Sequence, residues 1–383
     1  MKKKLPALLP VAVFLTMVFG FSLWNLLRPA RSFSENENRA LAQLPQFSLE
    51  SLFAGTFTSD YEEYLTDQFP LRDEWISLKT RAELLLGKKD VNNVYFGKNG
   101  WLLDKYKGTL SEERMQDNLA KLGEFTHYAA GLLGEDHVRA MLVPTASGVL
   151  TNRLPPFASD FDQAAMLAQA EALCPEGTFL SLLPALQEHQ EEYIYYRTDH
   201  HWTTLGAYYG YAAWAESCGL TPWAREDFSE ATLTTEFYGT THSKINLPVY
   251  PDSIIQYTPR REVSYQVNYN LGQKETSTLY DLEKLEGKDK YAVFLGGNNP
   301  IVTITCSAGE PGRKLLIVKD SYAHCFAPFA ANHFESTTLV DLRYFNMGVK
   351  AFMEQEGFTD VLVLYSTANF ADDRNLNTLV REG

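Results

Sequence analysis

The sequence predicts an α/β fold in which a parallel sheet is flanked by helices on both faces. Three continuous apolar runs lie near the C-terminus, at 314–318, 338–342 and 361–365. Helical patterns at 322–332 and 349–356 separate these runs. Strands that are apolar on both faces are typical of a parallel sheet covered by helices on either side. A polar group also follows each run, which is where such sheets bind their ligands.

Composition and charge narrow the class of protein. The chain has 383 residues, of which 45% are hydrophobic, so it is long enough to bury a large core in one large domain or two small ones. The net charge of −14 argues against binding to nucleic acid and against a basic membrane-binding patch.

The N-terminus carries a targeting signal. Three lysines within residues 1–4 precede an apolar run at 5–27, which is long enough to span a bilayer. The lysines favour the cytoplasm for residues 1–4, so the bulk of the chain would lie outside the cell membrane. We therefore predict a cytoplasmic tail at 1–4 and a single-pass transmembrane signal anchor at 5–27. A cleaved signal peptide is the alternative, but the run is longer than usual and no A-x-A-like site directly follows it.

Residues 28–47 are polar and contain two prolines, which predicts a juxtamembrane arm. The remaining 48–383 would form the extracytoplasmic domain. Within it, 48–86 has helical spacing of apolar residues. Residues 94–103 read as a hairpin, because Asn-Gly between apolar strands is a strong turn signal.

The middle of the chain alternates helical and strand patterns. The expected elements are a helix at 112–133, a strand at 138–143, a helix at 161–173, a strand at 179–183 and a short helix at 186–192.

A strand ending at 193–196 leads into a helix at 205–219, which Thr203 or Thr204 can cap. Residues 226–310 form a β-rich insertion of antiparallel strands, in which 291–295 and 301–305 are the two strands of a hairpin. The four cysteines, which lack a C-x-x-C pair, are either free buried thiols, which we favour, or disulfide-bonded: Cys174, Cys218, Cys306 and Cys325.

A carboxylate and two imidazoles lie next to one another between the strand and the helix at 205–219. Asp199 and His201 are two residues apart, so on extended backbone they would point to the same side. A carboxylate beside an imidazole can fix its tautomer, as in a catalytic triad. His200 would face away and form structural hydrogen bonds. Trp202 is either a core residue or a platform for substrate.

Ser321 is the candidate nucleophile, because it follows a buried strand and precedes a helix whose N-terminus can stabilise an oxyanion. Asn369, after the last strand, can add an amide donor. Ser321, His201 and Asp199 would then be nucleophile, base and orienting group. His324, one helical turn after Ser321, is an alternative base.

Two further interpretations remain open near this site. Asp341 and Arg343 either form an ion pair or bind a carboxylate on a carbohydrate. Asp199, His200 and His201 could alternatively be metal ligands, but adjacent residues of an extended strand point to opposite faces, so one ion rarely takes both histidines.

At this point the sequence resembles a known family. Asp199-His200-His201-Trp202 gives the DHHW family of bacterial envelope proteins its name, and it is similar to the Asp-x-His-Trp signature of alginate O-acetyltransferases, which are SGNH hydrolase-like. Three other segments resemble family motifs: the arm 34–41, the hairpin 97–103 and the nucleophile block 319–322. The resemblance covers roughly 33–383.

The resemblance implies an SGNH-like fold with a permuted block order, in which the Asp/His pair precedes the serine. It implies the triad Ser321, His201 and Asp199, and an oxyanion and substrate side formed by a further set: Asn369, Asp320, Arg343 and Trp202. The implied activity is an O-acyltransferase or esterase that acts on acetyl groups of an envelope glycan or exopolysaccharide. A membrane-bound acyl-transfer partner is expected, without a soluble cofactor or a metal.

Two departures from the family pattern support a different class of function. Lys319 stands where the superfamily usually has glycine, and Thr367-Ala368-Asn369 stands where Gly-x-Asn-Asp is expected. The alternative is therefore a non-catalytic envelope module that uses the same cleft to bind a glycan or to assemble a complex.

Overall fold

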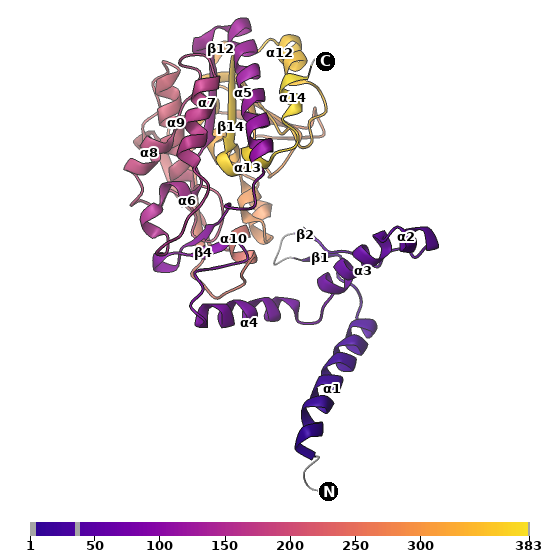
Figure 1. Cartoon of the computed structure of the whole chain (residues 1–383). Helices are drawn as coiled ribbons and strands as arrows, with labels where there is room; N and C mark the ends of the chain where they lie inside the picture. The colour runs from indigo at the N-terminus through magenta and orange to yellow at the C-terminus, as the bar shows by residue number, and fades with distance from the viewer. Residues whose placement is uncertain (1–4, 35–38, 382–383) are drawn as a thin grey trace. The chain divides into compact units, whose positions relative to one another are not determined.

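The computed structural model describes residues 5–34 and 39–381 and divides the chain into two compact units (Figure 1). The first unit is Met1–Val91 with Ser243–Pro248, and the second is Asn92–His242 with Val249–Gly383. The predicted tail at 1–4 lies outside the described residues, as does part of the predicted arm.

The first unit begins with helix α1, which confirms the helix predicted at 5–27. Its segment Leu8–Leu27 is long and apolar enough to cross a membrane. The helical pattern at 48–86 is confirmed as three helices. The elements of this unit are α1 (Leu5–Leu27), β1 (Phe33–Ser34), β2 (Arg39–Ala40), α2 (Leu49–Phe53), α3 (Thr56–Asp67), α4 (Arg72–Leu85) and β3 (Asp90–Val91).

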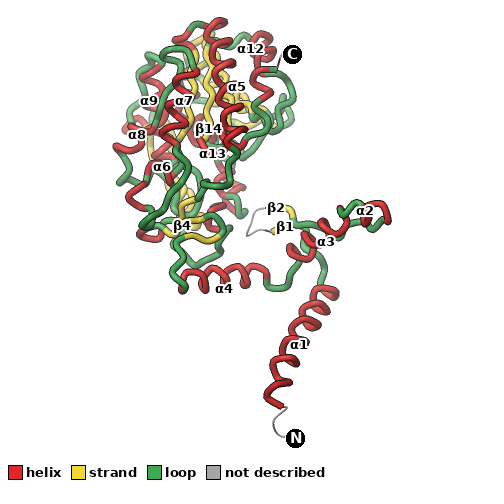
Figure 2. Tube along the Cα trace, viewed as in Figure 1, coloured by secondary structure: helices red, strands yellow, loops and turns green. Residues whose placement is uncertain are grey.

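The second unit contains the sheet and most of the helices (Figure 2). Its strands are β4 (Val94–Phe96), β5 (Leu102–Asp104), β6 (Val138–Val143), β7 (Phe228–Phe237), β8 (Asp252–Pro259), β9 (Tyr265–Tyr269), β10 (Lys274–Thr276), β11 (Ile301–Cys306), β12 (Glu310–Lys319), β13 (Phe334–Val340) and β14 (Asp360–Ser366). The remaining helices are α5 (Glu112–Leu133), α6 (Ala146–Val149), α7 (Gln163–Leu173), α8 (Leu183–Glu188), α9 (Thr204–Ser217), α10 (Thr240–Ser243), α11 (Ala323–Ala330), α12 (Val349–Glu356), α13 (Thr367–Asp372) and α14 (Asn377–Val380).

The central sheet is mixed, with the strand order β10-β9-β11-β13-β12-β14-β6. Strands β13, β12, β14 and β6 are parallel, whereas β11, β9 and β10 add antiparallel strands at the β13 edge. The predicted parallel sheet is therefore confirmed for four strands, but the whole sheet is mixed, because part of the predicted insertion joins it instead of forming a separate layer. Strands β7 and β8 do form a separate antiparallel pair.

The parallel strands are buried on both faces, as their continuous apolar runs predict. Along β12, Leu315 and Ile317 contact a core that includes α9 and α11, whereas Leu316 and Val318 contact a core that includes α5, α7 and α12. Because successive side chains of a strand point to opposite faces, the sheet has a helical layer on each side.

The chain reverses its direction across the sheet at β12. From β12 it passes through α11 to β13 on one side, and then through α12 to β14 on the other side of β12. In open α/β sheets the ligand binds at such a switch point, beyond the carboxyl ends of the strands. Ser321 lies two residues after the last residue of β12, so the fold places it at this position.

The predicted helices 112–133, 161–173, 205–219, 322–332 and 349–356 are confirmed with small shifts of their ends. The predicted hairpin at 94–103 is also confirmed, since β4 pairs with β5 antiparallel.

Three of the predicted strands are wrong. Residues 179–183 form only one isolated bridge, from Phe179 to Ala140, before α8 begins. At 291–295, Leu295 has a φ of 54° and is followed by two glycines with positive φ, so the backbone turns away from an extended conformation. The segment 193–196 folds back as a loop, which is described below.

All four cysteines are free, and all except the half-buried Cys218 are buried. This agrees with the interpretation as free thiols.

We expect the Leu316→Ala substitution to lower the free energy of unfolding by about 2–5 kcal/mol, because Leu316 is fully buried on β12 and its truncation leaves a cavity. Leu132→Ala is the matched control, since Leu132 is 47% exposed on α5, and its loss should be below about 0.5 kcal/mol. Urea denaturation of both variants measures the difference. Equal losses would contradict the assignment of Leu316 to the core.

Candidate active site

The Asp-His-His-Trp segment lies in a tight loop that two backbone hydrogen bonds close. The N–H of Tyr196 donates to the carbonyl of His201 (3.2 Å), and the N–H of Thr203 donates to the carbonyl of Ile194 (2.9 Å). Inside the loop, the N–H of His201 donates to Oδ1 of Asp199 (3.0 Å). Aspartate commonly accepts the N–H two residues on, which stabilises a turn. The predicted strand end is therefore only one antiparallel bridge, from Tyr195 to Trp202, and the turn at 197–201 that follows it brings Asp199 and His201 together.

His201 connects a carboxylate to the candidate nucleophile. Its Nδ1 lies 2.5 Å from Oδ1 of Asp199, and its Nε2 lies 2.7 Å from Oγ of Ser321. Because a carboxylate only accepts, the ring proton is on Nδ1 and the lone pair of Nε2 faces the serine hydroxyl. The geometry is that of a nucleophile, a base and an orienting acid.

The carboxylate of Asp199 is buried and fully hydrogen-bonded. Its Oδ2 accepts from the N–H (2.8 Å) and the hydroxyl (3.1 Å) of Thr240. Burial by itself would raise the pKa of Asp199, but the charges of His200 and His201 and the hydrogen bonds hold that pKa well below its usual value. Asp199 is therefore ionised and can stabilise a protonated His201.

A glycine makes room for this carboxylate. A Cβ on Gly239 would lie 2.2 Å from Cβ and 2.3 Å from Oδ2 of Asp199, so a side chain cannot fit there without displacing the carboxylate. Gly239 directly precedes Thr240, which explains how the backbone N–H of Thr240 approaches Asp199 so closely.

Aromatic rings on both sides hold the imidazole of His201. The ring of Tyr291 stacks on it with centroids 3.8 Å apart and an angle of 11° between the planes. The ring of His200 lies 3.9 Å away at 37°. His200 does form a structural hydrogen bond, from Nδ1 to Oγ1 of Thr240 (2.7 Å), but the expectation that it faces away from the pair is wrong, because the backbone turns here.

Asp320 connects the ends of two strands. Its Oδ1 accepts the N–H of Tyr322 (2.8 Å), and its Oδ2 accepts from the N–H (2.9 Å) and hydroxyl (3.0 Å) of Ser366. Asn369 donates its side-chain amide to the same Oδ2 (2.8 Å). Asp320 therefore holds the ends of β12 and β14 together next to Ser321. It also lines the cavity described next, so its predicted contact with a substrate stays a prediction.

Asn369 and Arg343 line a cavity of about 280 Å³, which reaches Asp320, the residue before Ser321, but is lined by none of the residues Asp199, His201 and Ser321. The full lining is Asp320, Arg343, Tyr365, Asn369 and the run 372–375. Arg343 donates from Nε to Oδ1 (2.9 Å) and from Nη2 to Oδ2 (2.6 Å) of Asp341, so these two residues form the ion pair that was one of the two interpretations. The hydrogen bonds that Arg343 donates to Asp341 raise the pKa of Arg343.

Lys319 is buried, and its charged end is hydrogen-bonded within the protein. Its Nζ donates to Oδ2 of Asp341 (3.1 Å) and to Nε2 of His324 (2.8 Å). Burial lowers the pKa of Lys319 and lowers the pKa of His324 well below its usual value. His324 is therefore engaged with Lys319, and the hydroxyl of Ser321 hydrogen-bonds to His201 and not to the alternative base.

Trp202 is a core residue. Its side chain is fully buried, and its Nε1 donates to the carbonyl of Tyr322 (3.0 Å). The predicted contact with substrate is therefore corrected: the indole supports the backbone next to Ser321 and has no surface to offer a ligand.

The Asp-His-His cluster places three potential ligand atoms within 4.8 Å of one another. The objection that the two histidines face opposite sides does not hold, because the backbone is a turn. However, the nitrogen and oxygen atoms concerned already bond within the protein, since Asp199 pairs with His201 and His200 pairs with Thr240. A metal ion here would have to break the hydrogen bonds of the triad.

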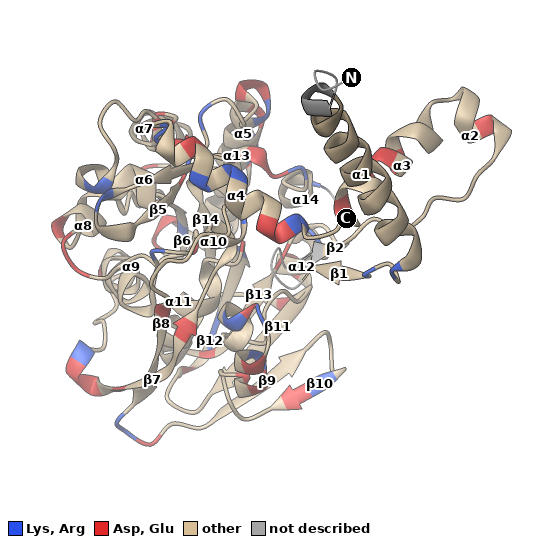
Figure 3. Cartoon of the chain, turned by 90° about the horizontal axis from the view of Figure 1, so that it is seen from below, with Lys and Arg blue, Asp and Glu red and all other residues tan. Residues whose placement is uncertain are grey.

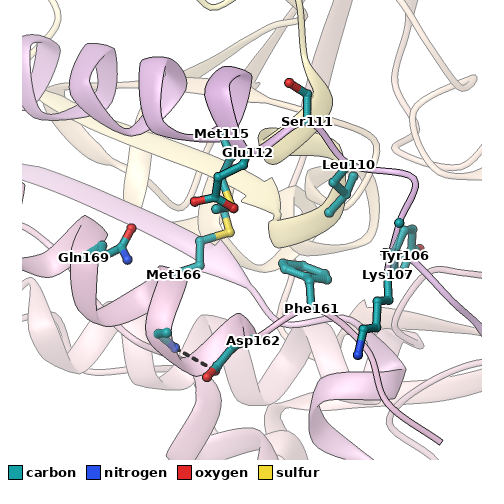
Figure 4. Close-up of a pocket in the computed structure, with 12 residues that line it drawn as sticks. Tyr106, Lys107, Leu110, Ser111, Glu112, Met115, Phe161, Asp162, Met166 and Gln169 are labelled. Carbon is teal, nitrogen blue, oxygen red and sulfur yellow. Dashed lines mark hydrogen bonds between the residues drawn. The ribbon is translucent and has the colours of Figure 1, made fainter.

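A second hollow of about 320 Å³ lies between the starts of α5 and α7 (Figure 4). Its floor contains Met115, Met166 and Phe161, and its rim carries Lys107 and Glu112. None of the triad residues lines it.

Sequence reasoning selected three residues that hydrogen bonds join in the structure, Asp199, His201 and Ser321, but it missed the groups that surround them. Tyr291 was assigned to a strand, and its ring instead stacks on His201. Gly239 and Thr240 lie in a stretch without hydrophobic periodicity, so no local signal connects them to Asp199. Only folding brings these residues next to the triad.

Comparisons with known proteins show the family of this chain and proteins of similar fold. The family model described as DHHW protein matches residues 124–340, which is more than half of the chain. A DHHW family protein from Eubacterium siraeum DSM 15702 is 24% identical, with a TM-score of 0.59 over 76% of this chain and 96% of its own. Bacillus cereus PatB1 with a sulfonyl adduct is 18% identical, with a TM-score of 0.59 over 73% of this chain and 96% of its own. No curated protein matches the sequence.

We expect Asp199→Asn to destabilise the protein by about 3 kcal/mol at pH 7. The NH₂ group of the new side chain and the backbone N–H of Thr240 are both donors, so the hydrogen bond between them is lost in a buried place. The pKa of Asp199 is lowered in the folded state, so its contribution is fully present above the unfolded pKa of about 3.9 and is lost as the pH falls below that value. The difference in stability between parent and variant should therefore shrink below about pH 4.

Urea denaturation between pH 7 and pH 3 measures this trend. Asp117→Asn is the control, because Asp117 is an exposed carboxylate paired with Lys121 on α5 and should contribute less than about 1 kcal/mol. A difference for Asp199→Asn that stays constant down to pH 3 would contradict the assigned charge.

We also expect Gly239→Ala to lower the free energy of unfolding by about 1–3 kcal/mol, because the added Cβ overlaps Asp199. Gly131→Ala on α5 is the matched control, since its Cβ would meet no atom within 4 Å, and stability should stay equal or rise. Thermal denaturation of both variants checks this. An unchanged melting temperature for Gly239→Ala would contradict the prediction, because it would mean that the loop of Asp199 moves aside without a loss of stability.

Proposed function

This chain belongs to the DHHW protein family, and we propose that it is a membrane-anchored, extracytoplasmic O-acyltransferase or esterase. It would act on acetyl groups of an envelope glycan or exopolysaccharide through Ser321, His201 and Asp199. The observation that carries this proposal is the continuous chain of hydrogen bonds from Asp199 through His201 to the hydroxyl of Ser321. The triad comes in the order Asp, His, Ser, as the permuted arrangement of an SGNH-like enzyme requires.

The proposed reaction begins at the hydroxyl of Ser321. Its oxygen attacks the acetyl carbonyl carbon while the proton moves to Nε2 of His201, and Asp199 stabilises the imidazolium. The protonated His201 then gives this proton to the departing alcohol or carrier group, which leaves an acetyl-serine. A glycan hydroxyl, or water, transfers its proton to His201 and attacks the ester carbon. The bond to Oγ of Ser321 breaks, His201 returns the proton to Oγ, and the acetylated glycan, or acetic acid in the case of water, leaves.

Donors beside Ser321 can stabilise the developing oxyanion. Asn369 is exposed and uses one amide hydrogen on Asp320, which orients the amide and leaves the second hydrogen for a ligand. One such donor is typically worth about 3 kcal/mol of barrier. The position of Asn369 therefore supports its proposed role despite the departure from Gly-x-Asn-Asp.

The cavity lined by Arg343 and Asn369 is the proposed place for the glycan. It combines guanidinium, amide and carboxylate groups, which suit the hydroxyl groups of a sugar. Arg343 is held by Asp341, so its guanidinium is fixed in orientation without being moved away from the cavity.

We propose that α1 is an uncleaved anchor, which places the site outside the cell membrane. Its apolar segment has the length of a membrane span. A membrane-bound partner that delivers the acyl group then meets the enzyme at the membrane surface.

Acetyl-ester cleavage by the full-length protein, with Ser321→Ala and His201→Ala beside it, tests the mechanism. We expect each variant to lose activity by about 10⁴-fold or more, because triad members act as a unit. Asp117→Asn is the control for the preparation of the variant proteins. Asp117 is far from the three residues in sequence, so this variant should keep full activity.

A sulfonyl fluoride probe provides a readout that needs no acceptor glycan. PatB1, which shares the fold, is known with a sulfonyl adduct, so covalent labelling suits this architecture. We expect labelling of the parent and none of Ser321→Ala, as detected by mass spectrometry. A folded parent that is neither labelled nor active would refute the enzyme, and glycan binding by a non-catalytic module would be the remaining proposal.

A further inference from the structure

Helix α4 exposes an apolar stripe. Leu71, Trp75, Leu78, Ala82 and Leu85 recur at intervals of four and three residues, which places them on one side of the helix. All five are exposed, with Trp75 at 38%, Leu78 at 55% and Leu85 at 90%.

The opposite side of α4 is the side that is buried. Thr80 is fully buried, and its hydroxyl lies 3.1 Å from the carbonyl oxygen of Ile245 within the same unit. Ile76 and Leu84, one turn before and after Thr80, are half-buried on this side. A surface helix of a soluble protein buries its apolar side and exposes its polar side. Helix α4 instead leaves a second, apolar stripe exposed, so water is not the natural surrounding of this stripe.

The rest of the first unit shares this property. Although it is much the smaller unit, it exposes more large apolar side chains than the described part of the second unit does, even without α1. Besides the stripe, the most exposed are Leu44, Phe47, Leu49, Phe53 and Leu86. Exposed apolar side chains in such density mark an interaction surface.

The membrane-spanning candidate contacts the stripe directly. Phe21 lies within the apolar segment Leu8–Leu27, and its ring lies 5.5 Å from that of Phe69 and 6.0 Å from that of Trp75. Figure 3 shows that α1 carries no Lys, Arg, Asp or Glu among its described residues. Because Phe21 is six residues before the end of α1, these contacts lie about 9 Å below that end along the helix axis.

The junction of α3 and α4 is also tied to the residues after α1. The side chain of Gln68 is buried; it accepts the N–H of Arg31 (2.9 Å) and donates to the carbonyls of Arg31 (2.8 Å) and Ala42 (3.1 Å). The start of α4 is thereby held at the outer end of the span.

From these contacts we propose that α4 lies in the membrane–water interface on the extracytoplasmic side of the membrane that α1 crosses, with its apolar stripe in the lipid. This inference rests on the proposed anchoring by α1. Tryptophan and leucine on one side of a helix are typical of interfacial helices, and Trp75 has the amphipathic ring that such interfaces favour. A seam between two copies would use the same spacing, but the stripe covers only two heptads, which is short for a coiled coil.

Lipid quenching of a dye in the full-length protein tests this placement. Leu78→Cys and Leu85→Cys variants are labelled with an environment-sensitive dye and placed in phosphatidylcholine nanodiscs with or without doxyl-labelled lipid. We expect at least about two-fold quenching at both positions, since an interfacial helix buries its apolar side about 5–10 Å into the headgroup and acyl boundary.

Leu132→Cys is the matched control, because Leu132 is exposed to 47%, close to the value for Leu78, but lies on α5 of the second unit. Its dye should not be quenched. The parent protein, which has no introduced cysteine, is treated with the same dye. It gives the background signal from the native cysteines, three of which are buried.

Three results would overturn the proposal in distinguishable ways. If the protein does not stay with the nanodiscs, the proposed anchoring by α1 fails, and the interfacial placement fails with it. If the protein is anchored but the dyes at positions 78 and 85 respond like the control, only the placement of α4 is wrong. If quenching is absent and Leu78→Cys forms disulfides between copies as the number of chains per disc rises, the stripe is a self-association surface.

Discussion

The buried carboxylate of Asp199 is the constraint on which the rest of the site depends. A charge in a protein interior is stable only when donors surround it, and Asp199 has these from His201 and Thr240. Meeting that requirement determines the turn at 197–201, the glycine at 239 and the tautomer of His201. The hydrogen bond that His201 donates to the charged Asp199 fixes the orientation of its ring, and in this orientation Nε2 faces Ser321.

The same physical principle organises the strand ends around the nucleophile. Asp320 and Asp341 follow β12 and β13, and both are buried carboxylates that accept several hydrogen bonds. Asp320 joins β12 to β14, and Asp341 joins β12 to β13 through Lys319. The three parallel strands are therefore connected at the edge where the chain reverses direction. This explains how the protein accommodates a lysine in place of the glycine expected before Asp-Ser: its long side chain reaches Asp341, which compensates the buried charge.

Much of the fold could be predicted from local patterns, because they report burial directly. The apolar runs at 314–318 and 361–365 are strands buried on both faces, and the helix at 112–133 has its predicted ends. Strand pairing was harder to predict from the sequence. Strands β9 and β11 join the main sheet, although their local sequence does not distinguish them from strands of a separate insertion. Tyr291 was missed for a similar reason, since its apolar neighbours resemble a strand while three residues with positive φ bend the chain.

The sequence by itself determined which residue types occur in the two short motifs at 199–202 and 319–322, the apolar segment at 5–27 and the helical spacing of α4. Each of these features depends only on residues that are close together in the chain. Tertiary structure alone decided the 2.7 Å contact between His201 and Ser321, which are far apart in the chain, and the donors around Asp199. It also decided that the apolar stripe of α4 faces outward. Periodicity shows that a helix has two unlike sides, but which of them is covered depends on the elements that pack against it.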